Sequence, residues 1–325
     1  MKGIRRKTAV VLFNLGGPDS LAAVRPFLFN LFNDHAIIGA PPPLRWLLAQ
    51  LISRRRAPIA RDIYRQIGGR SPLLEQTRAQ AAALEKALGE NHRVFIAMRY
   101  WHPFSCQTVR EVMAWAPDEV VLLPLYPQFS TTTTGSSLTD WRRQAHRAGL
   151  AAPCRVVRDY PCAPGLIAAQ AGLIGAALDE LQGQPVRLLL SAHGLPKKLI
   201  ARGDPYQRQV EQTARAVVDA LDRPGLDWTV CYQSRVGPLE WIGPATDDEI
   251  IRAGQQSRAV VIAPIAFVSE HSETLVELDI DYRKLAREHG VPAYYRVGAV
   301  GTAPEFIVAL ADLVGGEGGN PGGEK

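Results

Sequence analysis

The chain has 325 residues, of which 46% are apolar and 21% charged, and its formal net charge is +5. These values are typical of a folded protein of one large or two smaller domains, and they exclude a disordered chain, a collagen and a coiled coil. No apolar run approaches the roughly 18 residues that a membrane-spanning helix needs, and the four cysteines form no Cys-x-x-Cys pair. We therefore expect a cytoplasmic protein with reduced thiols, and the modest basic surplus argues against nucleic acid as a partner.

Short apolar runs alternate with helical segments along the chain, which is typical of a doubly wound α/β fold with buried parallel strands. The predicted strands are 9–15, 93–98, 119–125, 155–157, 186–191, 228–233, 259–263 and 293–297. The main predicted helices are 73–88, 108–114, 164–181, 206–221 and 269–289. Because four strands fall before residue 150 and four after it, we predict two similar four-stranded halves, 1–150 and 151–314, facing each other across a cleft. A disordered glycine-rich tail is predicted over 315–325.

The segment 36–56 stands apart from this alternation. A triple proline precedes a stretch in which five apolar residues fall on one helical face, bordered by Trp46 and by three consecutive arginines. These five are Leu44, Leu47, Leu48, Leu51 and Ile52. Two interpretations stay open: a helix that packs this face on the core, or an amphipathic element that touches a membrane surface or a hydrophobic ligand.

His193 lies at a position where open α/β sheets bind their ligands, beyond the carboxyl end of the predicted strand 186–191. Gly194 beside it permits an unusual backbone angle, and Pro196 prevents the strand from continuing. A histidine at this point can act as a general base or as a metal ligand. A structural histidine bonded to a loop carbonyl is the alternative.

The predicted helix 269–289 carries four carboxylates at steps of three, four and four residues. On an α-helix these side chains fall within roughly 80° of one another. They are Glu270, Glu273, Glu277 and Asp281. Because like charges four residues apart oppose helix formation, the pattern is either a solvated acidic face or a carboxylate ladder that attracts a divalent cation. His271 and Glu273 would supply nitrogen and oxygen ligands suited to Fe²⁺.

Aromatic residues follow two of the predicted strands. Arg99, Tyr100 and Trp101 come directly after 93–98, and Trp241 follows 228–233. They would suit a pocket for a flat apolar ligand whose acid group pairs with Arg99, although core aromatics beside a surface arginine would give the same pattern. The Thr/Ser-rich segment 131–137 lacks the lysine and the spacing of a P-loop, which argues against a nucleotide site.

Seven motifs occur in a fixed order, at 12–18, 68–72, 98–103, 125–137, 191–196, 232–238 and 267–275. From about residue 9 to residue 311 the chain resembles the ferrochelatase family. The resemblance implies two Rossmann-like halves around a porphyrin cleft. It also implies insertion of Fe²⁺ into protoporphyrin IX with release of two protons, the last step of haem synthesis.

The resemblance also implies roles for individual residues. His193 and Glu273 correspond to the catalytic and metal-site pair, and 36–56 corresponds to a lip that shields the macrocycle and can meet a membrane. The family's acidic path for protons or metal corresponds to Glu270, His271, Glu277 and Asp281. Its porphyrin-lining positions correspond to Leu15, Arg99, Tyr100, Ser234 and Trp241.

The chain departs from some relatives. It has no cysteine after Cys231, so we expect neither a [2Fe–2S] cluster nor any other tightly bound cofactor, with Fe²⁺ acting as substrate. Asp281 is shorter than the glutamate common in the family. We favour a monomer in the cytoplasm, with peripheral contact to the inner membrane through 36–56. The rival interpretations are a chelatase for coproporphyrin or sirohydrochlorin, and a tetrapyrrole-binding module without turnover.

Overall fold

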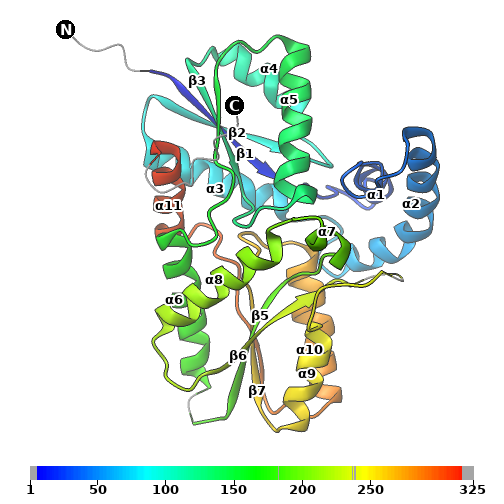
Figure 1. Cartoon of the computed structure of the whole chain (residues 1–325), viewed down its shortest axis with the longest axis vertical. Coiled ribbons are helices and arrows are strands. Elements are labelled where there is room, and N and C mark those ends of the chain that lie inside the picture. The colour runs from blue at the N-terminus through cyan, green and yellow to red at the C-terminus, as the bar shows by residue number, and fades with distance from the viewer. Residues whose placement is uncertain (1–5, 182, 236, 238, 317–325) are drawn as a thin grey trace. The chain divides into compact units, whose positions relative to one another are not determined.

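The computed structural model describes residues 6–181, 183–235, 237 and 239–316 (Figure 1). It divides into two compact units: unit 1 holds the described residues up to Tyr160 and from Leu310 onward, and unit 2 is Pro161–Ala309. Each unit contains one parallel sheet of four strands covered by helices. The predicted α/β class, with two similar Rossmann-like halves, is therefore confirmed.

Unit 1 has the strand order β2-β1-β3-β4. Its strands are β1 (Thr8–Asn14), β2 (His92–Met98), β3 (Glu119–Pro124) and β4 (Cys154–Val156). Its helices are α1 (Val24–Phe32), α2 (Pro42–Arg65), α3 (Leu73–Leu88), α4 (Ser105–Trp115), the π-helix η1 (Thr131–Gly135) and α5 (Ser136–Ala148). All seven residues of β1 are buried, which explains why this strand reads as a continuous apolar run rather than as an alternating one.

Unit 2 has the equivalent order β6-β5-β7-β8. Its strands are β5 (Val186–His193), β6 (Asp227–Gln233), β7 (Ala259–Pro264) and β8 (Tyr294–Arg296). Its helices are α6 (Pro164–Glu180), α7 (Lys197–Ala201), α8 (Tyr206–Leu221), α9 (Thr246–Gln255), the π-helix η2 (Glu273–Asp281) and α10 (Tyr282–Glu288). A last helix, α11 (Pro304–Gly315), begins in unit 2 and ends in unit 1. The tail predicted over 315–325 lies, from residue 317 onward, outside the described residues.

The two sheets repeat one hydrogen-bond register. Phe13 of β1 pairs with Pro124 of β3, and Ser191 of β5 pairs with Pro264 of β7, so each central strand meets a proline at the same point. Near the end of β2 the amide of Met98 donates to the carbonyl of Pro103, 2.7 Å away, and near the end of β6 the amide of Tyr232 donates to the carbonyl of Pro244 at 2.9 Å. Phe13 and Ser191, which pair with Pro124 and Pro264, are therefore equivalent positions. His193, two residues after Ser191, is equivalent to Leu15, two residues after Phe13.

The helix α2 does not bury its leucine face, which was one of the two interpretations of its sequence. Its buried residues are Ala49, Ser53, Ala57 and Tyr64, whereas Leu44, Leu47 and Leu51 are 50%, 59% and 47% exposed. The expectation that the leucine face packs on the core is wrong. Small side chains on the opposite face allow a close approach to another helix, and α2 lies beside α1 (Figure 1).

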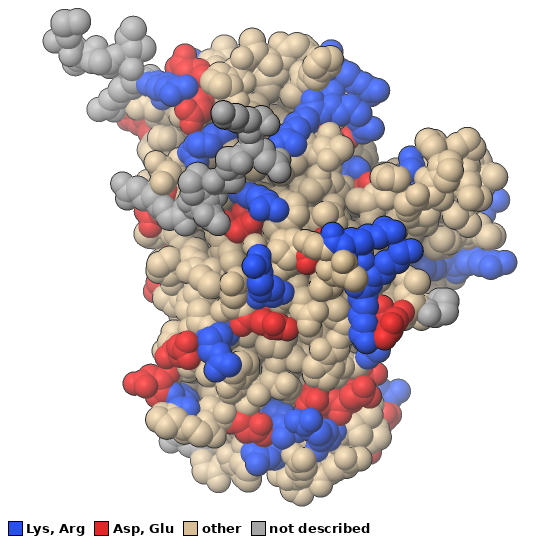
Figure 2. All heavy atoms as spheres, viewed as in Figure 1, with Lys and Arg blue, Asp and Glu red and all other residues tan. Residues whose placement is uncertain are grey.

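Charged side chains of both signs are interspersed over the face shown in Figure 2, with no single basic stripe on that face. Among the described helices, none combines the length and the apolar character that crossing a bilayer demands.

Candidate functional site

His193 is the last residue of β5, two residues beyond the predicted end of that strand. It therefore lies at the carboxyl edge of the sheet. Gly194 follows, and its amide donates to the carbonyl of Gln233 at the end of β6, 2.8 Å away. A Cβ atom on Gly194 would lie only 2.9 Å from that carbonyl oxygen. The close approach of the loop to β6 therefore requires glycine, and it fixes the backbone on which His193 is presented.

The π-helix η2 brings a carboxylate to this histidine. Glu273 is its first residue, and Glu273 Oε2 lies 3.0 Å from Nδ1 of His193. The same oxygen lies 3.5 Å from Nε2 of the buried His271. His193 and Glu273, 80 positions apart in sequence, thus form one half-buried pair with a second imidazole beside it.

His193 and Glu273 shift each other's pKa. Burial alone would lower the pKa of His193, but the Glu273 carboxylate, and after it Glu277, raise that pKa above its usual value. Burial alone would raise the pKa of Glu273, but His193 and His271 hold it well below its usual range. The pairing therefore favours the protonated form of His193 and the ionised form of Glu273.

Glu277 lies one turn further along η2 and is surrounded by donors. Its Oε1 accepts from the amide of Ser234 at 2.7 Å and from the hydroxyl of Tyr282 at 3.1 Å. Its Oε2 accepts from the hydroxyl of Ser234 and from Nε2 of Gln233 at 3.3 Å. Burial and the neighbouring charge of Glu273 nevertheless raise the pKa of Glu277. A proton shared between these two carboxylates would therefore reside on Glu277.

The predicted α-helix 269–289 needs a correction. The structure has a π-helix over Glu273–Asp281, followed by the α-helix over Tyr282–Glu288, and Glu270 precedes both. The carboxylates are therefore not arranged at the α-helical 100° per residue. Asp281 ends η2 on an exposed position, where partial burial raises its pKa. Segments of π-helix occur frequently at functional sites because they redirect side chains within a helix.

Glu270 faces away from the pair toward β8. Its Oε1 accepts from Nη1 of Arg296 at 2.6 Å and from the amide of Ala299 at 2.9 Å. Its Oε2 accepts from the hydroxyl of Thr274. Both oxygens are committed to these groups, and Arg296 is a residue that the sequence did not single out.

Trp241 lies beside the loop that follows His193. Its backbone forms a β-bridge with Pro196, and the amide of Ile242 donates to the carbonyl of Leu195 at 3.0 Å. Its ring carbon Cε3 is 3.4 Å from where a side chain on Gly194 would begin. Unit 2 therefore brings Trp241 and Ser234 to the same edge of the sheet as the charged pair.

The predicted residues of unit 1 form a network of their own. Arg99 donates from Nη2 to Asp34 at 2.8 Å and from Nε to Ser136 at 2.7 Å. Tyr100 is fully buried, and its hydroxyl donates to Asp34 at 2.8 Å. Leu15 is half-buried directly after β1. Asp34 was missed in the sequence because only the tertiary fold brings it to residues 65 and 66 positions away.

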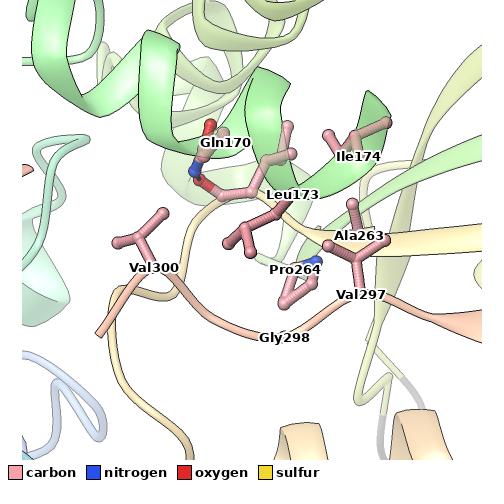
Figure 3. Close-up of a pocket in the computed structure, with 9 residues that line it drawn as sticks. Gln170, Leu173, Ile174, Ala263, Pro264, Val297, Gly298 and Val300 are labelled. Carbon is pink, nitrogen blue, oxygen red and sulfur yellow. Dashed lines mark hydrogen bonds between the residues drawn. The ribbon is translucent and has the colours of Figure 1, made fainter. Parts of the chain in front are cut away.

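Two further observations concern ligands. Figure 3 shows an apolar crevice between α6 and the ends of β7 and β8, in which Gln170 is the one polar side chain among nine lining residues. It has about 10 Å³ of room for a water-sized sphere, which is enough for about one water molecule. Within the described residues, no group of three or more His, Cys, Asp or Glu is arranged to hold a metal ion.

Comparisons with known proteins agree with this geometry. The Ferrochelatase family model matches residues 7–317. A ferrochelatase of Caulobacter vibrioides is 59% identical over 316 residues, which cover 95% of this chain and 90% of that protein. A ferrochelatase of Wolbachia from Drosophila simulans is 51% identical, covering 94% of this chain and 98% of that protein.

Among solved structures, SirB from Bacillus subtilis with Fe³⁺ has a TM-score of 0.59 at 12% identity, covering 96% of both chains. At this identity the likeness concerns the fold alone. The family model and the curated relatives each extend over almost the whole sequence. The chain belongs to the ferrochelatase family.

Proposed function

We propose that the chain inserts Fe²⁺ into protoporphyrin IX to form protohaem, with His193 and Glu273 as the residues at which metal and protons are exchanged. The observation that carries the residue assignment is the 3.0 Å contact between the His193 imidazole and the Glu273 carboxylate at the carboxyl edge of the sheet. The reaction releases two N–H protons of the macrocycle for each Fe²⁺ that enters. The site must therefore accept protons and pass them on.

The pairing sets the roles of the two residues. His193 acts in its neutral form, because only the neutral imidazole can accept a pyrrole proton or bind a metal ion. Glu273 stays ionised and stabilises the imidazolium that forms on each proton transfer. The raised pKa of Glu277 makes it the next proton acceptor, and the exposed Asp281 ends the route at solvent.

The same proposal assigns five residues to porphyrin binding. Tyr100 is fully buried, so it would act by holding the Asp34–Arg99 network, while the partly exposed Arg99 would meet the macrocycle. The five are Leu15, Arg99, Tyr100, Ser234 and Trp241.

We further propose a cytoplasmic monomer without a [2Fe–2S] cluster and without a nucleic-acid partner. In it, α2 makes peripheral contact with the inner membrane. The support for membrane contact is the outward apolar face of α2, which carries Leu44, Leu47 and Leu51 next to Arg54, Arg55 and Arg56. Apolar side chains flanked by arginines are typical of helices that lie in a membrane interface.

The test is metalloporphyrin formation by the purified protein without oxygen, with Fe²⁺ or Zn²⁺ and protoporphyrin, coproporphyrin or sirohydrochlorin in separate arms. We expect turnover with protoporphyrin. His193→Ala and Glu273→Gln should each lower kcat by about 100-fold or more and leave porphyrin affinity largely intact. Glu288→Gln, an exposed carboxylate on α10, is the matched control and should turn over normally. Full activity of either site variant would falsify the residue assignment, and turnover confined to another tetrapyrrole would replace the substrate.

A further inference from the structure

The start of η2 is fastened to the sheet by an ion pair that lies apart from the metal-site residues. Arg296 ends β8, and its guanidinium donates from Nη1 to Glu270 Oε1 at 2.6 Å. The Arg296 and Glu270 side chains are only 13% and 19% exposed. A charge pair this far from water is weakly screened, so it fixes geometry more firmly than a surface pair does.

Arg296 also reaches the far end of the same π-helix. Its Nη2 lies 3.6 Å from Oδ2 of Asp279, and Asp279 is further held by Arg283 at 2.6 Å. Arg296 itself is fixed because β8 pairs with β7, with Arg296 opposite Ile262. One guanidinium therefore ties the segment before η2, through Glu270, and the end of η2, through Asp279, to the sheet that carries His193.

The link from this clamp to Glu273 runs through Thr274. The fully buried Thr274 donates its hydroxyl to Glu270 and accepts the amide of His271 at 3.0 Å. Glu273 lies between His271 and Thr274 in the chain. Its 3.0 Å contact with His193 has little tolerance, since a displacement of about 1 Å would break it.

A clamp is needed because η2 is a π-helix. This conformation is rare and is maintained only where the surrounding structure determines it. The described contacts that join η2 and its flanking residues to β8 and the loop after it include Arg296 with Glu270 and Asp279, Ala299 with Glu270, and Arg283 with the carbonyl of Tyr294. Of these residues, Arg296 contacts both the segment before η2 and the end of η2.

We propose that Arg296 is a positioning residue for metal insertion, acting through Glu270 and Asp279 to hold η2 so that Glu273 faces His193. This inference rests on the proposed function. It assigns Glu270 to the anchoring of η2, and it leaves proton transfer to Glu273, Glu277 and Asp281.

The variants are Arg296→Met, which keeps the bulk of the side chain, Arg296→Lys, which keeps the charge, and Glu270→Gln. Partners of this kind, one layer behind the reacting groups, are worth about 10- to 100-fold in activity. We expect Arg296→Met to lower kcat by that factor and to change the KM for porphyrin by less than about threefold. Arg296→Lys should recover part of the loss, since an ammonium can pair with Glu270 but cannot span to Asp279. Amide hydrogen exchange in η2 should accelerate in Arg296→Met.

Arg187→Met is the matched control. Arg187 is a buried arginine at the start of β5, paired with Asp227 at 2.9 Å and bonded to Gln256 at 2.8 Å. It lies at the opposite end of the strand from His193. Its loss should lower the melting temperature about as much as Arg296→Met and leave kcat unchanged, so a fall in kcat in both variants alike would reduce the effect to stability and overturn the proposal.

Glu273→Gln, measured in parallel, separates this inference from the proposed function. Wild-type kcat in Arg296→Met beside an inactive Glu273→Gln overturns the role of Arg296 alone. An active Glu273→Gln overturns the proposed function instead. Should Arg296→Met fail to fold, Arg296→Lys and Glu270→Gln decide the matter, and wild-type kcat in both of them refutes positioning by the clamp.

Discussion

Removing Asp34 tests the most heavily bonded carboxylate of unit 1. One oxygen, Oδ2, accepts from Arg99 Nη2 and from the hydroxyl of Tyr100, both at 2.8 Å, and from the hydroxyl of Ser136. The other, Oδ1, accepts from the amide of Ala36 at 3.0 Å. Asp34→Ala would leave a largely buried guanidinium, 19% exposed, and a fully buried phenol without the acceptor that compensates them.

The expected loss of stability follows from the charge on Arg99 that Asp34→Ala leaves without its partner. Breaking a buried ion pair by deleting one partner costs about 3–5 kcal/mol, because the other charge stays buried and uncompensated. Arg99 keeps its 2.7 Å bond to Ser136, which places Asp34→Ala toward the lower half of that range. Asp34→Asn retains a carbonyl acceptor but no charge, so we expect about half the loss.

The pH dependence has a definite sign. Burial alone would raise the pKa of Asp34, but Arg99, Ser136, Ala36 and Tyr100 lower it below the ordinary value of 3.8. A carboxyl with a depressed folded pKa stabilises the fold fully above its unfolded pKa and loses that contribution as the pH falls through the folded one. The difference between wild type and Asp34→Asn should therefore be complete at pH 7 and should shrink below about pH 4.

Urea unfolding, combined with amide exchange of β1 to report on unit 1 alone, measures the loss, since a chain of two units need not unfold in one step. Asp62→Asn is the control: Asp62 lies exposed on α2 and pairs with the exposed Arg65, so its removal should change stability by less than about 0.5 kcal/mol. A loss below about 1 kcal/mol in Asp34→Ala, or a loss of equal size in the control, would refute the reasoning from buried pairing.

Two further predictions concern the site and α2. Because Glu273 and Glu277 raise the pKa of His193 and only the neutral imidazole binds a metal ion, metal insertion at limiting metal should fall as the pH drops through that pKa. Glu273→Gln removes the carboxylate that raises it, so the imidazole resonances of His193 in NMR should then titrate at lower pH; an unmoved titration contradicts the pairing. For α2, Leu47→Ser with Leu51→Ser should weaken sedimentation with vesicles containing anionic lipid. Leu173→Ser, an exposed leucine on α6, should not, and equal binding by all variants argues against membrane contact through α2.

The sequence was sufficient for the strands because their signal is local. A run such as 259–263 is apolar at every position, and every residue of β7 is buried, so composition and burial coincide. The ends of strands were predicted less well. The predicted strand 186–191 continues to His193, because the ladder with β6 extends to the pair His193–Gln233. Pairing with a distant strand decided that boundary, and no local pattern contains it.

The π-helix and the Asp34 network lay beyond local patterns for a physical reason. Spacing on a helical wheel presupposes 3.6 residues per turn, and a π-helix differs in that very quantity. Asp34 and Arg99 meet only when α1 has packed beside the end of β2. The leucine face of α2 shows that local patterns are limited in another way, since periodicity locates an apolar face but does not reveal what covers it.

The repeated register of the two sheets does not depend on a repeat in the sequence. Position by position beyond the proline pairs, unit 1 has Leu15 where unit 2 has His193, and Arg99 where unit 2 has Gln233. The two sheets have the same hydrogen-bond register because these bonds join backbone atoms, which are present whatever the side chain. The side chains at the strand ends are where the two units differ.

That difference is also a difference in charge. In unit 2, Gln233 donates to the carboxylate of Glu277. In unit 1, the equivalent Arg99 donates to the hydroxyl of Ser136, which cannot neutralise it. The compensating charge comes from Asp34, in the connection between β1 and β2 that runs from residue 15 to residue 91 and has a much shorter counterpart in unit 2. Carboxylates beside the end of β6 would suit a cation and would accept protons, whereas the neutralised Arg99 would not. We therefore expect the metal chemistry in unit 2, where the backbone arrangement is the same and the carboxylates of η2 lie close by.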